Sequence, residues 1–286
     1  MQAPTNSIAA AAATGLQDPA PTMRRRSTTR VDQPARPTDE RALPQLGLGG
    51  IIGVWAAAAL PMGLLAWLVA PLLAEQLSGS GALPRALIVT LAAGLIWQFV
   101  LVLVLVAREQ GTLRWPVLRD ALWLRAPRAP RTGRRGGWAW LVVLPLLVAL
   151  AAEELVPTVG LPAGRDMVEF LGSNAGEELL AGSWGWFAII AALAVFNTVL
   201  GEELLFRGFL LPRMNGVFGR RDWVANGVLF AVYHLHMPWV IPAALLDTFI
   251  LAYPSRRYRS ALIGIAVHSA QSVVILALVL ALVLKG

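Results

Sequence analysis

Long runs of hydrophobic residues, separated by short polar segments, are the dominant pattern of this chain. A run of about 20 apolar residues is long enough, as a helix, to cross the roughly 30 Å hydrocarbon layer of a bilayer. The pattern therefore predicts an all-α polytopic membrane protein with about seven transmembrane helices, within a range of six to eight. The runs cover residues 51–74, 84–107, 138–152, 185–211, 222–236, 239–254 and 259–284.

The region 222–254 has a second interpretation. As a helix, the segment before Pro238 is only about 22 Å long. The region forms either two full spans or a re-entrant hairpin, which membranes tolerate where the backbone is buried in protein or lines a water-filled cavity. Both interpretations leave the two ends of the chain on the same sides of the membrane.

Composition supports the membrane class. Hydrophobic residues make up 57% of the 286 residues, charged residues make up 14%, and the mean hydropathy is +0.62. This surface is too apolar to hide in one water-soluble core. The chain has no Cys, which excludes disulfides, thiolate metal ligands and a cysteine nucleophile.

Polar composition and loop charge predict the domains and the topology. Residues 1–47 are rich in Ala, Pro, Thr and Arg and have no apolar period, which predicts a disordered cytoplasmic tail before a helical membrane domain at 48–286. Arg is concentrated in this tail, in the loop 108–135 and near residues 213–221 and 256–259, whereas the loop 153–183 is acidic. Because cytoplasmic loops carry excess Arg and Lys, we expect the N-terminus inside and the C-terminus outside. The composition is typical of a bacterial protein, so the expected location is the bacterial inner membrane.

Several ionisable residues lie within the apolar runs. Each costs about 2.5–3.5 kcal/mol at the centre of a membrane helix, so a chain that keeps them there is expected to use them. At 1.5 Å per residue, Glu202, His234 and His268 lie about 14–18 Å from the cytoplasmic boundary. We therefore predict that a carboxylate and two imidazoles from separate helices converge on one water-containing pocket that opens to the cell interior.

Spacing within the fourth run suggests different roles for its two acids. Glu203 and Arg207 are four residues apart and face each other on a helix, which predicts a structural ion pair. Glu202 is turned about 100° away and stays available. A carboxylate beside an imidazole can hold a water molecule and act as a general base. Attack of that water on a peptide carbonyl would then need donors for the developing oxyanion.

Two further helical faces could complete the site. Asn226, Phe230 and His234 share one face that can meet Glu202, whereas His236 points elsewhere and ranks below His234. The last run carries His268, Gln271 and Ser272 on a connected face, and these are the candidate oxyanion donors. A single buried His more often serves packing alone, but three at matched depth beside Glu202 favour function. The Gly-Glu-Glu-Leu-Leu at 176–180 repeats the start of the key motif in a loop without a following Arg, so we assign it no role.

Three motifs resemble those of a known family. Glu-Glu-Leu-Leu-Phe-Arg at 202–207, Phe-Ala-Val-Tyr-His at 230–234 and His268 are similar, in this order, to the signatures of the CAAX-protease and bacteriocin-processing enzyme family. This family, also called Abi, includes the eukaryotic CAAX prenyl endopeptidase, and the similarity spans about residues 185–275. The resemblance implies an all-helical intramembrane protease in which Glu202 and His234 activate water and the third motif stabilises the oxyanion.

The third motif departs from the family pattern at Ser272, where Asn is common. A Ser hydroxyl donates one hydrogen bond with a shorter reach, which predicts reduced activity unless Gln271 takes over. Family members are often called metalloproteases, yet the motifs lack His-Glu-x-x-His, so a zinc site would need Glu202, His234 and His268 together. We expect a metal-free mechanism without a cofactor, with a divalent metal such as zinc at these three residues as the alternative.

The expected partners are membrane lipids and a membrane-associated peptide or protein substrate, and no nucleic acid. The substrate's identity and the oligomeric state are left open. Two other function classes compete with proteolysis. A non-proteolytic scaffold or immunity protein could retain the fold without turnover, as Ser272 suggests. A proton-coupled transporter is less favoured, because corresponding halves of the chain show no pair of broken segments.

Overall fold

The structure, a computed structural model, describes residues 43–79 and 81–286, and within these ranges it contains helices and no β-strand. Most of the predicted tail therefore lies outside the described residues. Of its last residues, Leu46 donates its backbone N–H to the Arg213 carbonyl at 3.0 Å, and the Gln45 side chain donates to the Pro212 carbonyl at 3.0 Å.

Five helical stretches in the described part of the chain are long and apolar enough to cross a membrane. The predicted all-α polytopic class is confirmed. The two spans predicted within 222–254 are not among the five. The five stretches, numbered here as spans one to five, are Leu48–Ala74, Ala82–Gln110, Gly137–Leu155, Trp184–Arg213 and Ala261–Val283.

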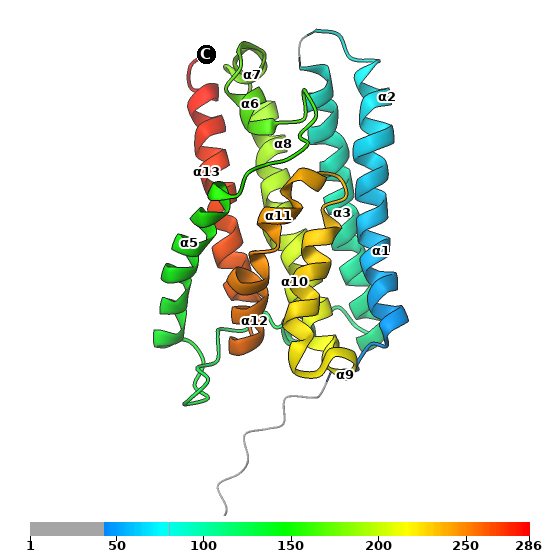
Figure 1. Cartoon of the computed structure of the whole chain (residues 1–286), viewed down its shortest axis with the longest axis vertical. Coiled ribbons are helices and arrows are strands. Elements are labelled where there is room, and N and C mark those ends of the chain that lie inside the picture. Colours follow the sequence, from blue (N-terminus) through cyan, green and yellow to red (C-terminus); the bar gives the residue numbers. More distant parts are fainter. Residues whose placement is uncertain (1–42, 80) are drawn as a thin grey trace, which may run out of the picture. The chain divides into compact units, whose positions relative to one another are not determined.

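Most spans combine several helical segments. The first and second spans hold α1 (Leu48–Leu64), α2 (Ala70–Ala74) and α3 (Ala82–Gln110), and the third to fifth hold α5 (Val143–Ala151), α8 (Trp184–Val195) and α13 (Ala261–Val283). Helices α1, α3, α8 and α13 run lengthwise side by side (Figure 1). The remaining helices are α4 (Trp115–Ala121), α6 (Met167–Leu171), α7 (Asn174–Leu180), α9 (Asn215–Phe218), α10 (Asp222–Tyr233), α11 (Ile241–Ala244) and α12 (Tyr253–Tyr258).

Residues 222–258 form a re-entrant hairpin. Helix α10 is one arm, and the other arm returns to the same end through α12, where Arg256 Nε lies 2.6 Å from Asp222 Oδ2. The arms touch closely at Gly227, because a Cβ there would lie 2.5 Å from the Cα of Thr248. Small residues allow such close backbone approach inside membranes. Of the two interpretations of this region, the structure has the hairpin.

The Arg-rich loops gather at one end of the molecule, which we call the basic end and define by residues 108–135, 213–221 and 256–259. Arg213 binds Glu109 through two contacts of 2.6 and 2.7 Å, and Arg128 donates its backbone N–H to the Tyr258 carbonyl at 2.8 Å. These contacts join the three loops to one another.

The acidic loop 153–183 leads to the other end of the molecule. Gly182 donates its N–H to the carbonyl of Val283, the last residue of α13, at 3.0 Å. Helices α6 and α7 lie beside the end of α13, away from the basic end (Figure 1). The Arg-rich loops and the acidic loop therefore lie toward opposite ends of the molecule, as the charge pattern predicts.

Candidate active site

Glu202 and Glu203 lie in the centre of the fourth span, between two π-helical segments. These segments are Phe196–Gly201 and Leu204–Leu210. Every residue from 201 to 214 is buried, and Glu202 is only 2% exposed. π-helical turns are rare and occur frequently at functional sites, because they displace side chains from the regular helical register.

A cavity of about 700 Å³ adjoins this helix. Its walls come from the end of the third span, the segment 156–168, the fourth span, the apex of the hairpin and α13. Glu202, His234 and His268 all line it. The structure thus brings the three residues singled out in the sequence to one cavity, although they lie on separate elements.

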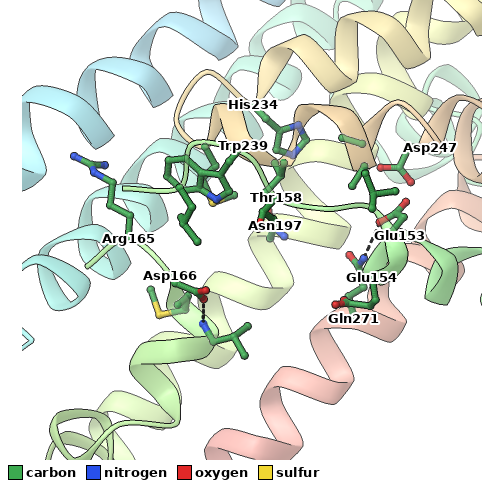
Figure 2. A pocket seen from close by; sticks show the side chains of 18 of the residues that line it. Glu153, Glu154, Thr158, Arg165, Asp166, Asn197, His234, Trp239, Asp247 and Gln271 are labelled. Carbon is green, nitrogen blue, oxygen red and sulfur yellow. Dashed lines mark hydrogen bonds between the residues drawn. The ribbon is translucent and has the colours of Figure 1, made fainter. Parts of the chain in front are cut away.

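His234 follows the last residue of α10, and its ring is hydrogen-bonded to the backbone. Its Nδ1 lies 3.0 Å from the carbonyl oxygen of Phe230 (Figure 2 shows the ring at the cavity). A carbonyl only accepts, so Nδ1 carries the proton and Nε2 keeps its lone pair. The Phe230 ring also lines the cavity and packs edge-on against His234, with 5.0 Å between ring centroids.

His268 is oriented by Glu203 rather than by Glu202. Its Nδ1 lies 3.1 Å from Glu203 Oε1, and Arg207 NH1 lies 3.4 Å from the same oxygen. The predicted contact between Glu203 and Arg207 is therefore present, but Glu203 has a second partner that the helical spacing did not indicate. The Arg207 guanidinium also lies over the Phe230 ring, 3.9 Å from its centroid, which provides a cation–π contact.

A buried hydrogen-bond chain leads from the second span to Glu202. Gln98 Nε2 donates to the hydroxyl of Tyr233, and that hydroxyl is hydrogen-bonded to Glu202. Since the hydroxyl accepts from Gln98, its own proton is free to be donated to the carboxylate. Neither Gln98 nor Tyr233 was singled out as a site residue in the sequence analysis. The position of Tyr233 directly before His234 was the one available signal.

Two residues near the second motif lie outside the cavity wall. Asn226 donates from Nδ2 to the Phe206 carbonyl at 2.9 Å, so it fastens the hairpin to the fourth span and does not meet Glu202. His236 stacks on His234, with 5.5 Å between centroids, and does not line the cavity. The lower rank of His236 agrees with this placement.

The expected oxyanion donors of the third motif are engaged elsewhere. Ser272 donates to Thr198 Oγ1 at 3.4 Å and does not line the cavity, because its face of α13 packs against the fourth span. Gln271 lines the cavity, but its Nε2 donates to Glu153 Oε2 at 3.1 Å. Asn197, which the sequence analysis did not single out, lines the cavity instead.

The cavity wall is formed in part by the acidic loop. The cavity is bounded by the hairpin apex and by the segment 153–168, which belongs to the acidic loop (Figure 2). Arg165 ties this segment to the first span, donating to the Ala66 carbonyl at 3.1 Å and stacking over Trp67 at 4.0 Å. The predicted opening to the cell interior stays a prediction, although part of the cavity wall belongs to the loop that the charge pattern places outside.

The arrangement does not suit the alternative zinc site. Among the described residues, no three or more His, Cys, Asp or Glu side chains are grouped so that they could hold a metal ion. Glu202, His234 and His268 line one cavity without forming such a group.

Residues 184–274 match a family model described as type II CAAX prenyl endopeptidase Rce1-like. The matched stretch runs from the start of α8, through the hairpin, into α13, so it contains all three motifs. This segment belongs to the CAAX-protease family. The CAAX-protease family is a family of proteases, which are hydrolases. The candidate membrane-spanning helices agree with a membrane protease. The match covers less than half of the chain, and no curated protein and no solved structure matches it. The CAAX-protease match leaves out the third span and the segment 156–168, both of which contribute to the cavity wall.

Proposed function

We propose that this protein is an intramembrane endopeptidase that hydrolyses a peptide bond of a membrane-associated peptide or protein. The observation that carries the proposal is the single cavity lined by Glu202, His234 and His268, within a CAAX-protease segment. Catalysis needs a base, an activated water and charge stabilisation within reach of one substrate carbonyl, and a shared cavity supplies the place for all three.

Glu202 and His234 activate the water. The Nε2 lone pair of His234 accepts a hydrogen bond from the water, and the Glu202 carboxylate takes its proton as the water oxygen attacks the carbonyl carbon. The carbon–oxygen π bond opens to a tetrahedral oxyanion. Glu202 then gives the proton to the leaving nitrogen as the peptide bond breaks, so that an acid and an amine are released.

His268 and Asn197 stabilise the oxyanion. With Nδ1 of His268 donating to Glu203, the Nε2–H of a protonated ring points away from that carboxylate and can donate to the oxyanion. Asn197 precedes Glu202 by five residues, and the π-helical turn between them, with its i to i+5 hydrogen bonding, places both on the same side. Its amide provides the donor that Ser272 does not deliver to the cavity.

The substrate enters from the side of the segment 153–168. This follows from the lining of the cavity, which includes the segment 156–168 of the acidic loop. If the basic end is cytoplasmic, as the Arg distribution predicts, the cleaved bond lies in the outer half of the bacterial inner membrane.

The test compares the termini of membrane peptides in cells that carry the wild-type protein, Glu202→Ala or His234→Ala. A terminus that depends on the wild-type protein should disappear in both variants. Glu178→Ala is the matched control, because it removes an exposed acid from the second Gly-Glu-Glu-Leu-Leu sequence and should leave the terminus in place. A terminus that persists in both active-site variants contradicts the proposal.

One observation favours a second function. Ser272 faces Thr198, so the third motif supplies no amide to the cavity, which suits a CAAX-protease relative that binds peptides without cleaving them. This scaffold function predicts identical termini with and without the wild-type protein, together with retained peptide binding.

A further inference from the structure

A second pair of acids lies in the cavity apart from the three motifs. Glu153 comes from the end of the third span, and Asp247 comes from the returning arm of the hairpin. Both line the cavity, where their side chains lie close to each other (Figure 2) and interact electrostatically. Gln271 of α13 holds Glu153 in place by donating to its Oε2 at 3.1 Å.

One carboxylate oxygen of each acid has no hydrogen-bond donor within the described part of the chain. Asp247 is only 5% exposed, and neither Asp247 Oδ1 nor Glu153 Oε1 has a partner that meets hydrogen-bond geometry within the described part of the chain. Ionised carboxylates only accept hydrogen bonds and repel each other, so two that lie close together in a buried place require either a proton or a nearby cation. A buried acceptor without a donor is unfavourable, which makes this place complementary to a positively charged group.

No Arg or Lys side chain of the cavity wall supplies that cation. Arg165 is the one Arg or Lys among the lining residues, and its guanidinium is engaged by the Ala66 carbonyl and the Trp67 ring. His268 lies within electrostatic range of both acids, but its Nδ1 is bound to Glu203. A metal ion fits poorly, since no group of three ligands is present among the described residues.

We infer that Glu153 and Asp247 form a subsite that binds a Lys or Arg side chain of the substrate close to the cleaved bond. The inference rests on the proposed function and adds the substrate class to it. The cavity is large enough for such a side chain beside the reacting carbonyl, and other acids that line it, including Glu154 and Asp166, reinforce the attraction for cations. A site built to pair with a polar group rejects an analogue that lacks it.

The experiment uses the full chain in lipid vesicles and membrane-anchored reporter peptides that share one apolar sequence. Each peptide carries a single Lys at one of several successive positions, and its twin carries Met there. For at least one position, wild-type protein should cleave the Lys peptide with a kcat/KM at least about tenfold above that of its twin. In Glu153→Gln, Asp247→Asn and the double variant, the ratio between twins should fall toward one. Glu169→Gln, which removes an exposed acid of the same loop outside the cavity, should keep the wild-type ratio.

Binding separates this inference from the proposed function. The Glu202→Ala protein retains both acids, so it should bind the Lys peptide about tenfold more tightly than the Met twin even if no peptide is ever cleaved. Adding Asp247→Asn should remove that preference. Equal binding of the twins by Glu202→Ala protein overturns the subsite, whereas retained preference without any cleavage overturns only the proteolysis. A preference that disappears on chelation with EDTA would assign the two acids to a metal ion and also overturn the subsite.

Discussion

Removing one oxygen from Tyr233 tests how Glu202 is prepared for catalysis. Tyr233→Phe keeps the ring, which packs against Phe206 and Phe230 with centroid separations of 5.3 and 6.3 Å, and deletes the hydroxyl that links Gln98 to Glu202. A hydrogen bond to a charged group contributes about 1.5–3 kcal/mol. If that bond stabilises the working carboxylate, kcat should fall roughly 10- to 150-fold.

KM should change much less than kcat. Tyr233 does not line the cavity, so KM is expected to stay within about threefold of the wild-type value. The assay measures kcat and KM in vesicles on the peptide whose terminus depends on the wild-type protein, together with the midpoint of thermal unfolding. Tyr253→Phe is the control, because the same substitution then falls on a residue that is 45% exposed. If Tyr233→Phe keeps more than half of kcat, or raises KM alone, the chain from Gln98 to Glu202 does not position the base.

Two further predictions concern buried charges. Glu109→Ala leaves the fully buried side chain of Arg213 with two backbone carbonyl partners and no counter-charge. The free energy of unfolding should fall by about 3–5 kcal/mol. A decrease of the thermal-unfolding midpoint by less than about 3 °C would contradict this. Gly264→Ala places a Cβ 2.1 Å from Glu203 Oε2, so Glu203 must leave its position and proteolysis should fall at least about tenfold. Gly53→Ala, where a Cβ would meet no atom within 4 Å, should retain activity, and equal activity of the two Ala variants would show that Glu203 can move without consequence.

The convergence of Glu202, His234 and His268 could be predicted because helices convert sequence distance into depth. Each residue lies a countable number of turns from a charged boundary, and equal depth on neighbouring helices brings side chains together. The same counting could not place Glu203 correctly. Its spacing to Arg207 indicates one partner, whereas the contact with His268 depends on how α13 packs against the fourth span.

Glu153 shows why the rest of the site could not be read from the chain. Its neighbour is also Glu, and the pair begins an acidic loop, which is the usual pattern of a surface. It reaches the cavity because the third span ends at Leu155 and the chain turns inward over the hairpin. Asp247 lies in an apolar run, but only the return of the hairpin brings it opposite Glu153. Both placements come from tertiary packing, which leaves no periodic signal.

The hairpin apex connects the fold to the chemistry. Irregular backbone at membrane depth is tolerated only where protein or water satisfies its polar groups. Here Trp67 Nε1 donates to the Leu235 carbonyl at 2.8 Å, and the His234 carbonyl accepts from the Met237 N–H at 2.9 Å. The break that ends α10 at Tyr233 therefore leaves few backbone N–H and C=O groups without a hydrogen-bond partner. It also lets the His234 ring bond back to the Phe230 carbonyl and turn its other nitrogen to the cavity, which an uninterrupted transmembrane helix would have placed against a neighbour or in lipid. A full span at this position would satisfy the apolar pattern equally well, but it would close the space that a water molecule and a peptide bond must share.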